Sequence, residues 1–433
     1  MTKSAHLDRR QLLWGGGLAM LASALPFGRR TARAAVTSTP KNFICVTVFG
    51  GWDTTYALDP KPFGGPIDVP AGAVAQFGDL DIFDDGSRPN VRNFFTRFAS
   101  ITTIVRGIKL PGVSHDACMQ TMLTGARDET SPDVAAMVAN IHSPELPVPY
   151  LVLGDTAFSG PYAASMGRVG PTNQIVGLLD PTEAYPIDNV RGQFVPTPTD
   201  EAAIRAYTTA RANRERAVRG ASGYNKRRID DFVASLDRGD RLRELGGALG
   251  HRGTQLTLAA QNGLALDAIQ TGISRSVTLS SRLTWDSHDN NAPIQHASHE
   301  ALFEGLTALI DDLATRPGAA VGSTMLDETV VAVISEMGRT PKLNKLPGAP
   351  DRGKDHWPVT SAMVIGAGIR GGRAFGATTN TGEPVLLDFA TGAPSAGGRT
   401  LEANHFVAGL ASACGIDPEV HFPEADAFRA FVA

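Results

Sequence analysis

Short apolar runs rich in β-branched residues recur along this 433-residue chain, and segments with helical periodicity separate them. Runs of this length that are bounded by glycine or polar turn residues are typical of strands buried on both faces. The expected strands are Phe43–Phe49, Ile101–Val105, Tyr150–Leu153, Ser276–Leu279, Thr329–Ile334 and Met363–Ile365. Strands that alternate with helices predict an α/β fold whose mostly parallel central sheet is covered on both faces.

Helix signals lie between these strands. Ser114–Leu123 predicts a helix whose first residue is its N-cap. Ser131-Pro132-Asp133 combines an N-cap, a proline at the first helical position and an early acid. Gln295–Thr315 has the periodicity of an amphipathic helix, and Leu401–Cys414 predicts a closing helix that Gly415 stops.

A stretch of different composition interrupts the alternation. Residues 199–264 are rich in Ala, Arg, Glu and Leu, and their periodicity predicts a helical insertion or lid carried by the main sheet. The charge run at residues 225–231 is interpreted as a solvated helix face. We expect this insertion to shape specificity.

The first residues have the pattern of an export signal. Arg9 and Arg10 precede an apolar stretch over residues 12–27, and Ala32-Arg33-Ala34 resembles a signal peptidase site. The paired arginines indicate the twin-arginine (Tat) route, with the Tat translocase as the partner during export. An uncleaved anchor is the alternative, but the stretch is shorter than the roughly 20 residues of a spanning helix. We expect a signal peptide over residues 1–34 and one large α/β domain over residues 35–433, periplasmic or secreted, with no spanning segment in the mature chain.

Charge and cysteine content exclude some classes of protein. Residues 1–34 carry six basic side chains against one acidic, a surplus of five, so their removal changes the net charge from −4 to −9. An acidic mature chain argues against a nucleic-acid partner, which would require a basic face. An odd, small number of cysteines is no disulfide framework, and Cys45, Cys118 and Cys414 are interpreted as buried apolar residues.

Polar residues follow several of the expected strands. In open α/β sheets the ligand sites lie beyond the carboxyl ends of the strands. Acids and histidines gather in such loops: Gly50-Gly51-Trp52-Asp53, Ser114-His115-Asp116, Trp285-Asp286-Ser287-His288, Ser335-Glu336-Met337-Gly338-Arg339 and Lys354-Asp355-His356. Each loop has a purely structural alternative, because Asp suits turns and caps and Glu336 could pair with Arg339. Together they predict a shared polar site, since carboxylates and imidazoles bind Zn²⁺, Mn²⁺ or similar ions.

The chain resembles the bacterial exported proteins grouped as domain of unknown function 1501, within the alkaline phosphatase and sulfatase superfamily. The matching stretches are Gly-Gly-Trp-Asp (50–53), Ser-His before Leu-Thr-Gly (114–125), Trp-Asp-Ser-His (285–288), Ser-Glu-Met-Gly-Arg-Thr-Pro (335–341) and Lys-Asp-His-Trp (354–357). The resemblance covers nearly all of the mature chain. It implies an alkaline-phosphatase-like three-layer αβα sandwich with a mostly parallel central sheet and a helical insertion.

The resemblance also implies roles for individual residues. Ser114 or His115 falls at the place of the nucleophile, and Arg339 is a candidate clamp for an ester oxygen. One or two divalent ions, Zn, Mn or Ca, are implied as cofactors. Their implied ligands are Asp53, Asp286, His288, Glu336, Asp355 and His356.

The sequence departs from the superfamily pattern at several positions. Glu336 stands where the superfamily has Asp, and Met337, a poor ligand for hard or borderline ions, stands where it has His or Asn. The chain has no Cys-x-Pro-x-Arg motif, which argues against a formylglycine sulfatase. Ser114 is either the nucleophile or only a helix cap. If it is only a cap, the nucleophile is metal-activated water, or the protein catalyses no reaction.

The sequence therefore predicts an exported, metal-dependent hydrolase of phosphate or sulfate esters, acting on a small-molecule or polymer substrate. The first alternative is a non-catalytic envelope protein that keeps the fold to bind a ligand or partner, which Met337 favours. The second is a cell-surface assembly protein that works with another exported protein.

Overall fold

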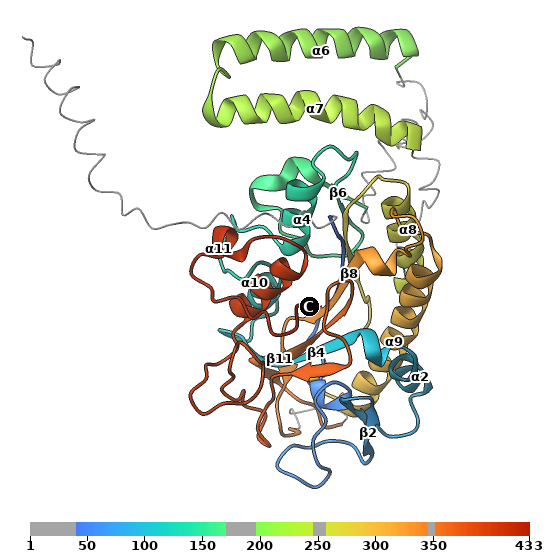
Figure 1. Cartoon of the computed structure of the whole chain (residues 1–433), viewed down its shortest axis with the longest axis vertical. Coiled ribbons are helices and arrows are strands. Elements are labelled where there is room, and N and C mark those ends of the chain that lie inside the picture. The colour runs from blue at the N-terminus through green and yellow to red at the C-terminus, as the bar shows by residue number, and fades with distance from the viewer. Residues whose placement is uncertain (1–39, 170–195, 246–256, 345–350) are drawn as a thin grey trace, which may run out of the picture. The chain divides into compact units, whose positions relative to one another are not determined.

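An eight-stranded sheet forms the centre of the protein in a computed structural model that describes residues 40–169, 196–245, 257–344 and 351–433 (Figure 1). The expected signal peptide, residues 1–34, lies outside the described residues. The strand order is β12-β4-β11-β8-β1-β7-β5-β6. The strands are β1 (Asn42–Val48), β4 (Thr102–Lys109), β5 (Tyr150–Val152), β6 (Met166–Arg168), β7 (Ser276–Ser280), β8 (Thr329–Ser335), β11 (Val359–Gly366) and β12 (Arg373–Phe375).

Strand β1 lies between β7 and β8 and runs parallel to both. Among the described strands of this sheet, β11 alone is antiparallel to its neighbours, β4 and β8. The side chains of β1 alternate between two hydrophobic clusters. Ile44 and Val46 belong to one, and Phe43 and Cys45 belong to the other. A strand buried on both faces needs a continuous apolar run, which explains why β1 could be predicted from its sequence.

Helices cover both faces of the sheet. α2 (Pro89–Phe98), α8 (Leu258–Gln270) and α9 (Asn291–Thr315) pack on the face of Ile44. α3 (His115–Thr124), α4 (Val134–His142) and α10 (Ala403–Ala413) pack on the face of Phe43. The structure confirms the predicted fold class, a three-layer α/β sandwich with a mostly parallel sheet.

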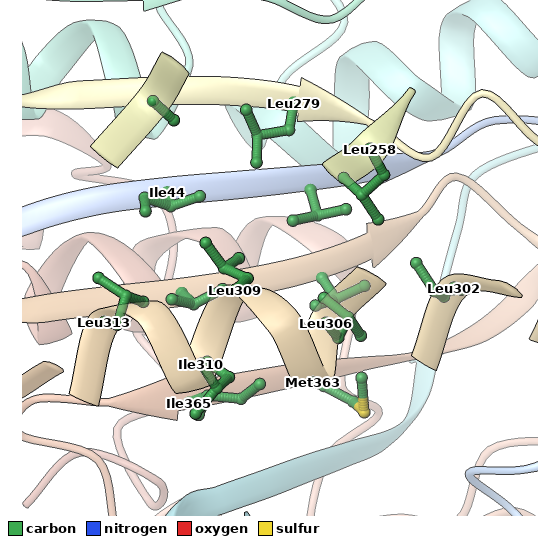
Figure 2. Close-up of a cluster of buried hydrophobic side chains, with 14 of the residues drawn as sticks. Ile44, Leu258, Leu279, Leu302, Leu306, Leu309, Ile310, Leu313, Met363 and Ile365 are labelled. Carbon is green, nitrogen blue, oxygen red and sulfur yellow. The ribbon is translucent and has the colours of Figure 1, made fainter. Parts of the chain in front are cut away.

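The longest of these helices shows how the layers are joined. Its buried residues recur every three or four positions, which places them on one side of the helix. Figure 2 shows Leu302, Leu306, Leu309, Ile310 and Leu313 of α9 facing Ile44, Leu279, Met363 and Ile365 of the sheet.

Smaller elements lie outside the three layers. β2 (Ala73–Phe77) and β3 (Leu80–Asp84) form an antiparallel hairpin, and β9 (Gly338–Arg339) pairs with β10 (His356–Trp357). In the stretch expected to be a helical insertion, α6 (Pro198–Val218) and α7 (Gly223–Leu245) lie side by side (Figure 1). Short helical turns are η1 (Thr54–Tyr56), η2 (Ala99–Ile101), η3 (Gly160–Ser165), η5 (Leu326–Glu328) and α11 (Pro418–His421).

One predicted helix start is wrong by two residues. α4 begins at Val134, and its N-cap is Asp133, whose carboxylate accepts from the Ala136 amide at 2.7 Å. The Ser131 hydroxyl instead donates to Asp128 at 2.7 Å. Asp133, which the sequence predicts in the first helical turn, is therefore the N-cap of the helix.

Three further expectations concern burial. Cys45, Cys118 and Cys414 are free and buried, as predicted. The charge run at residues 225–231 lies on α7 and is mostly exposed, which confirms a solvated helix face. None of the helices in the described ranges is long and apolar enough to cross a membrane.

Candidate functional site

The candidate site lies beyond the carboxyl ends of β7, β1 and β8, three neighbouring strands of the sheet. Gly50-Gly51 follows β1, Glu336 follows β8, and Asp286 stands six residues after β7. Gly50 has a φ of +121°, a conformation that L side chains rarely adopt, and its Cβ would lie 2.8 Å from the Asp286 amide. A glycine is therefore required at position 50, where the loop after β1 packs against the loop that carries Asp286.

The short β9–β10 ribbon adds the last histidine to this edge. His356 of β10 is the register partner of Arg339 of β9. Just before β10, Gly353 packs directly against the loop of His288, because its Cβ would lie only 1.8 Å from the His288 carbonyl oxygen. The Lys354 amide donates to the Ser287 carbonyl at 3.0 Å, which fixes the two loops to each other.

Three imidazoles at this edge each use Nδ1 to bond an oxygen. His115 Nδ1 lies 2.6 Å from Glu336 Oε1, and His288 Nδ1 lies 2.9 Å from Asp355 Oδ1. His356 Nδ1 lies 2.9 Å from the backbone carbonyl oxygen of Val113. A carbonyl or a carboxylate can only accept, so each Nδ1 donates its proton. Each neutral ring therefore presents a lone pair on Nε2.

The three Nε2 atoms converge on the carboxylate of Asp286. The Asp286 Oδ1 atom lies 3.2 Å from His288 Nε2 and 3.5 Å from His356 Nε2, and its Oδ2 atom lies 3.7 Å from His115 Nε2. The Nε2 atoms of His288 and His356 are 2.9 Å apart. Donor atoms of His115, Asp286 and His356 all lie within 4.8 Å of one another.

These donors fit a divalent metal ion. The Nε2 lone pairs of His288 and His356 face each other at 2.9 Å, which requires a cation or a proton between them. Ligand atoms about 2.0–2.1 Å from a zinc ion at tetrahedral angles stand about 3.3–3.4 Å apart, close to the spacing of Asp286 from both imidazoles. An imidazole whose other nitrogen donates to a carboxylate or carbonyl is the usual form of a metal-binding histidine. His115, Asp286 and His356 form one group of mutually close donor atoms, and His288 adjoins Asp286 and His356, so these four residues are the candidate ligands.

Charged neighbours keep Asp286 ionised. Burial acts to raise the pKa of Asp286, but the hydrogen bond and charge of Arg339, with His288 and His115, lower it below its ordinary value. The Arg339 Nη2 atom lies 2.7 Å from Asp286 Oδ1. An ionised carboxylate is the form that binds a metal.

Two of the imidazoles differ in their affinity for a proton. The hydrogen bond to Glu336 raises the pKa of His115, aided by the charges of Glu336 and Asp286 and opposed by burial. Burial lowers the pKa of His356, as do the positive charges of His115, Arg339 and His288. A proton is therefore held more readily by His115 than by His356.

The Arg339 guanidinium is fully buried, and its nitrogens form hydrogen bonds with the loops of the site. Its Nε donates to Gly51 O at 2.8 Å, and its Nη1 donates to Lys354 O at 3.1 Å. Its Nη2 bonds Gly50 O as well as Asp286. These contacts position the strand-end loops, and its predicted role as a clamp for an ester oxygen stays a prediction.

Asp53 lies apart from the histidine cluster, in a pair with a buried lysine. The Lys354 Nζ atom lies 2.6 Å from Asp53 Oδ2, and both side chains are 1% exposed. Asp53 also caps η1, because its Oδ1 accepts from the Thr55 amide at 3.2 Å and the Thr55 hydroxyl at 2.6 Å. Its predicted role as a metal ligand stays a prediction.

The remaining candidates surround the cluster. Glu336 and Asp355 bond the Nδ1 atoms of His115 and His288 and so orient these two rings. Ser114 is the exposed N-cap of α3, and its side chain makes no capping hydrogen bond. Met337 is fully buried in the hydrophobic core. The sequence predicts His115 as a catalytic residue. In the structure its ring also belongs to the group of candidate metal ligands with Asp286 and His356.

Two clefts lie elsewhere on the molecule. They have volumes of about 400 and 530 Å³ and share Gly125, Ala126 and Asn404 as lining residues. No residue of the histidine cluster lines either of them. We locate the site by its converging donor atoms, because an ion needs ligands rather than a large volume.

Comparison with known proteins gives a family and distant structural similarities. No curated protein matches the chain. Among solved structures, "Ps i-CgsB" has a TM-score of 0.36 at 11% identity, with 91% of this chain and 76% of that chain covered. A protein in the alkaline phosphatase superfamily from Vibrio parahaemolyticus has a TM-score of 0.36 at 10% identity, with 90% and 71% covered. A family described as "Protein of unknown function (DUF1501)" matches residues 96–391, more than half of the chain, and the protein therefore belongs to the DUF1501 family.

Proposed function

We propose that this protein is an exported, metal-dependent hydrolase of phosphate or sulfate esters. The observation that carries the proposal is the convergence of the Nε2 atoms of His115, His288 and His356 on Asp286. Three imidazoles and a carboxylate form a ligand set suited to zinc or a similar ion. A divalent ion bound there would supply Lewis acidity toward an ester oxygen.

The chain's own residues hold this arrangement in place. Glu336 and Asp355 fix the tautomers of His115 and His288, and the Val113 carbonyl fixes that of His356. Arg339 orients Asp286 and joins three loops through carbonyl oxygens, those of Gly50 and Gly51, of Lys354 and of Trp285. A site held in this way needs little rearrangement during a reaction.

Ser114 is the candidate nucleophile. Its side chain is exposed, adjoins His115 in sequence and is not used as a cap. The N-terminal end of α3 would stabilise negative charge that develops on the serine oxygen. If Ser114 serves only as the cap residue, water is the nucleophile, and Ser114→Ala would then retain hydrolysis.

Export belongs to the proposal as well. The paired arginines at positions 9 and 10, the apolar stretch and the Ala-Arg-Ala sequence indicate Tat-dependent transfer to the periplasm or the medium. Replacing both arginines by lysine should keep the precursor in the cytoplasm. Cell fractionation with a cytoplasmic marker measures this, and unchanged export would contradict the Tat route.

A non-catalytic envelope protein is the second candidate. It is favoured by Arg339, whose guanidinium is fully buried and bonded within the protein, and by Met337, which packs in the core. Such a protein would bind a ligand or partner at this edge of the sheet without turnover.

The deciding experiment is elemental analysis of the mature protein, purified without chelator, beside the Asp286→Ala/His288→Ala variant. The matched control is Asp289→Ala/His296→Ala, an acid and a histidine of the same region that lie outside the cluster. We expect bound metal in the wild type and control, none in the cluster variant, and hydrolysis of phosphate or sulfate esters that follows the metal. Equal metal content and equal hydrolysis in all three proteins would refute the proposal.

A further inference from the structure

The Asp53–Lys354 pair bears on how many ions the site can hold. Asp53 stands beyond the end of β1, where a second ion would be expected if the strand-end acids formed a two-metal centre. The ammonium of Lys354 is already there, 2.6 Å from Asp53 Oδ2, and both groups are 1% exposed. A buried carboxylate needs a positive partner, and here the partner is a side chain of the protein.

The carboxylate of Asp53 has no acceptor position left for a metal ion. Its Oδ1 accepts two hydrogen bonds from Thr55, one from the amide and one from the hydroxyl. Its Oδ2 accepts from Lys354 and from Asn291, at 2.6 and 3.3 Å. A carboxylate offers about four lone-pair sites, and all four are in use.

The lysine is held firmly in this position. Its amide donates to Ser287 O and its carbonyl accepts from Arg339, so the backbone on both sides of the side chain is fixed. The neighbouring Gly353 fits tightly against the His288 carbonyl. The backbone of the loop that carries Lys354, Asp355 and His356 is therefore fixed, and the Lys354 ammonium is held by its pair with Asp53.

We propose that the site binds one divalent ion, at His115, His288, His356 and Asp286, and that the Lys354 ammonium is the built-in cation beside Asp53. This inference rests on the proposed function and makes it more specific. The centre is mononuclear, and Lys354 is a positioning residue that takes up the charge of Asp53. A second divalent ion beside Asp53 would face a fixed positive charge in a buried environment.

The test is the metal stoichiometry of the purified protein, measured by native mass spectrometry and elemental analysis with Zn²⁺ and Mn²⁺ as probes. We compare the wild type with Asp53→Asn/Lys354→Met, in which both charges of the pair are removed together. We expect one equivalent in each protein. Two equivalents in the wild type and one in the double variant would overturn the inference and leave a metal-dependent function standing. No metal in either protein would overturn the inference together with the proposed function.

A single variant separates this role from a purely structural one. Lys354→Met leaves the Asp53 carboxylate without its cation, so added Zn²⁺ or Mn²⁺ should now bind as a second equivalent and raise the melting temperature more than in the wild type. The double variant should show neither effect. If Lys354→Met folds and still binds only one equivalent, the ammonium is not what excludes the second ion. If it does not fold, the stoichiometry of the wild type and double variant decides.

Discussion

His288 and His356 lie with their Nε2 atoms 2.9 Å apart, although each ring already donates its Nδ1 proton to an oxygen. Two neutral imidazoles in this arrangement direct lone pairs at each other, and a shared cation removes the repulsion. Asp286, within 3.5 Å of both Nε2 atoms, supplies a negative charge to the same point. The contact between the two rings therefore requires either a shared proton or a cation between the Nε2 atoms.

Asp355→Asn should weaken metal binding without removing a ligand. Asp355 accepts from His288 Nδ1 at 2.9 Å, and an amide there would make the imidazole less basic. Loss of such an orienting carboxylate lowers metal affinity by about 10–100-fold. Competition with a chelating dye measures the change. Asp351→Asn, on the exposed neighbouring turn, is the control, and an equal loss in both variants would assign the effect to the loop rather than to His288.

Lys354→Met should be among the most destabilising single changes near the site. Removing one member of a buried ion pair leaves an uncompensated charge and costs about 3–5 kcal/mol. Asp53→Asn/Lys354→Met should cost clearly less, because no buried charge remains unpaired. Urea unfolding in the presence of chelator compares the two. Equal losses would mean that packing of the lysine chain, and not its charge, stabilises the loop.

Gly353→Ala should disrupt the site through its backbone. The new Cβ would lie 1.8 Å from the His288 carbonyl, so the two loops that carry His288 and His356 must separate. We expect a loss of about 1–3 kcal/mol in stability, as for overpacked interiors, together with weaker metal binding. Gly263→Ala in α8 is the control, because no atom lies within 4 Å of its Cβ and alanine favours a helix. A Gly353→Ala variant with wild-type metal affinity would show that the loops adjust independently.

The fold was more predictable than the roles within the site, for a physical reason. Buried strands such as β1 and β8 are continuous apolar runs, and this signal is local in sequence. The β2–β3 hairpin lacks that signal because the side chains of β2 are all at least partly exposed. The start of α4 was misplaced because Ser131 and Asp133 are both good caps, and only tertiary contacts select between them.

The rule that ligand sites lie beyond the carboxyl ends of the strands located the acids and histidines of the site. It could not assign the contacts that these side chains make. The resemblance implies a metal-ligand role for Asp53, but the pairing of Asp53 with Lys354 is not visible in the sequence, because the two residues are 301 positions apart. The resemblance implies that Glu336 and Asp355 are metal ligands, and in the structure each bonds the Nδ1 atom of a histidine. Which nitrogen of a ring faces outward depends on side-chain geometry, and a sequence motif does not contain it.

His299 should make the protein less stable as the pH falls. Its ring is buried beside Trp52, Trp285 and Tyr56, and its Nδ1 donates to the Gln295 carbonyl at 2.8 Å. Burial, with the positive charge of Arg88, lowers the pKa of His299 to about 3. In the unfolded chain the pKa is near 6.5, so between about pH 3 and 6.5 the unfolded state binds the extra proton.

The stability contributed by neutral His299 is therefore complete above about pH 6.5 and is lost as the pH falls, by up to about 1.4 kcal/mol per unit. His299→Phe keeps an aromatic ring in the same place and removes the titration. We expect its unfolding free energy to fall less than that of the wild type between pH 7 and pH 5. Urea unfolding at several pH values measures the difference. Leu306→Met, a volume-conserving change on the same helix, should shift stability equally at every pH, and parallel curves for wild type and His299→Phe would contradict the prediction.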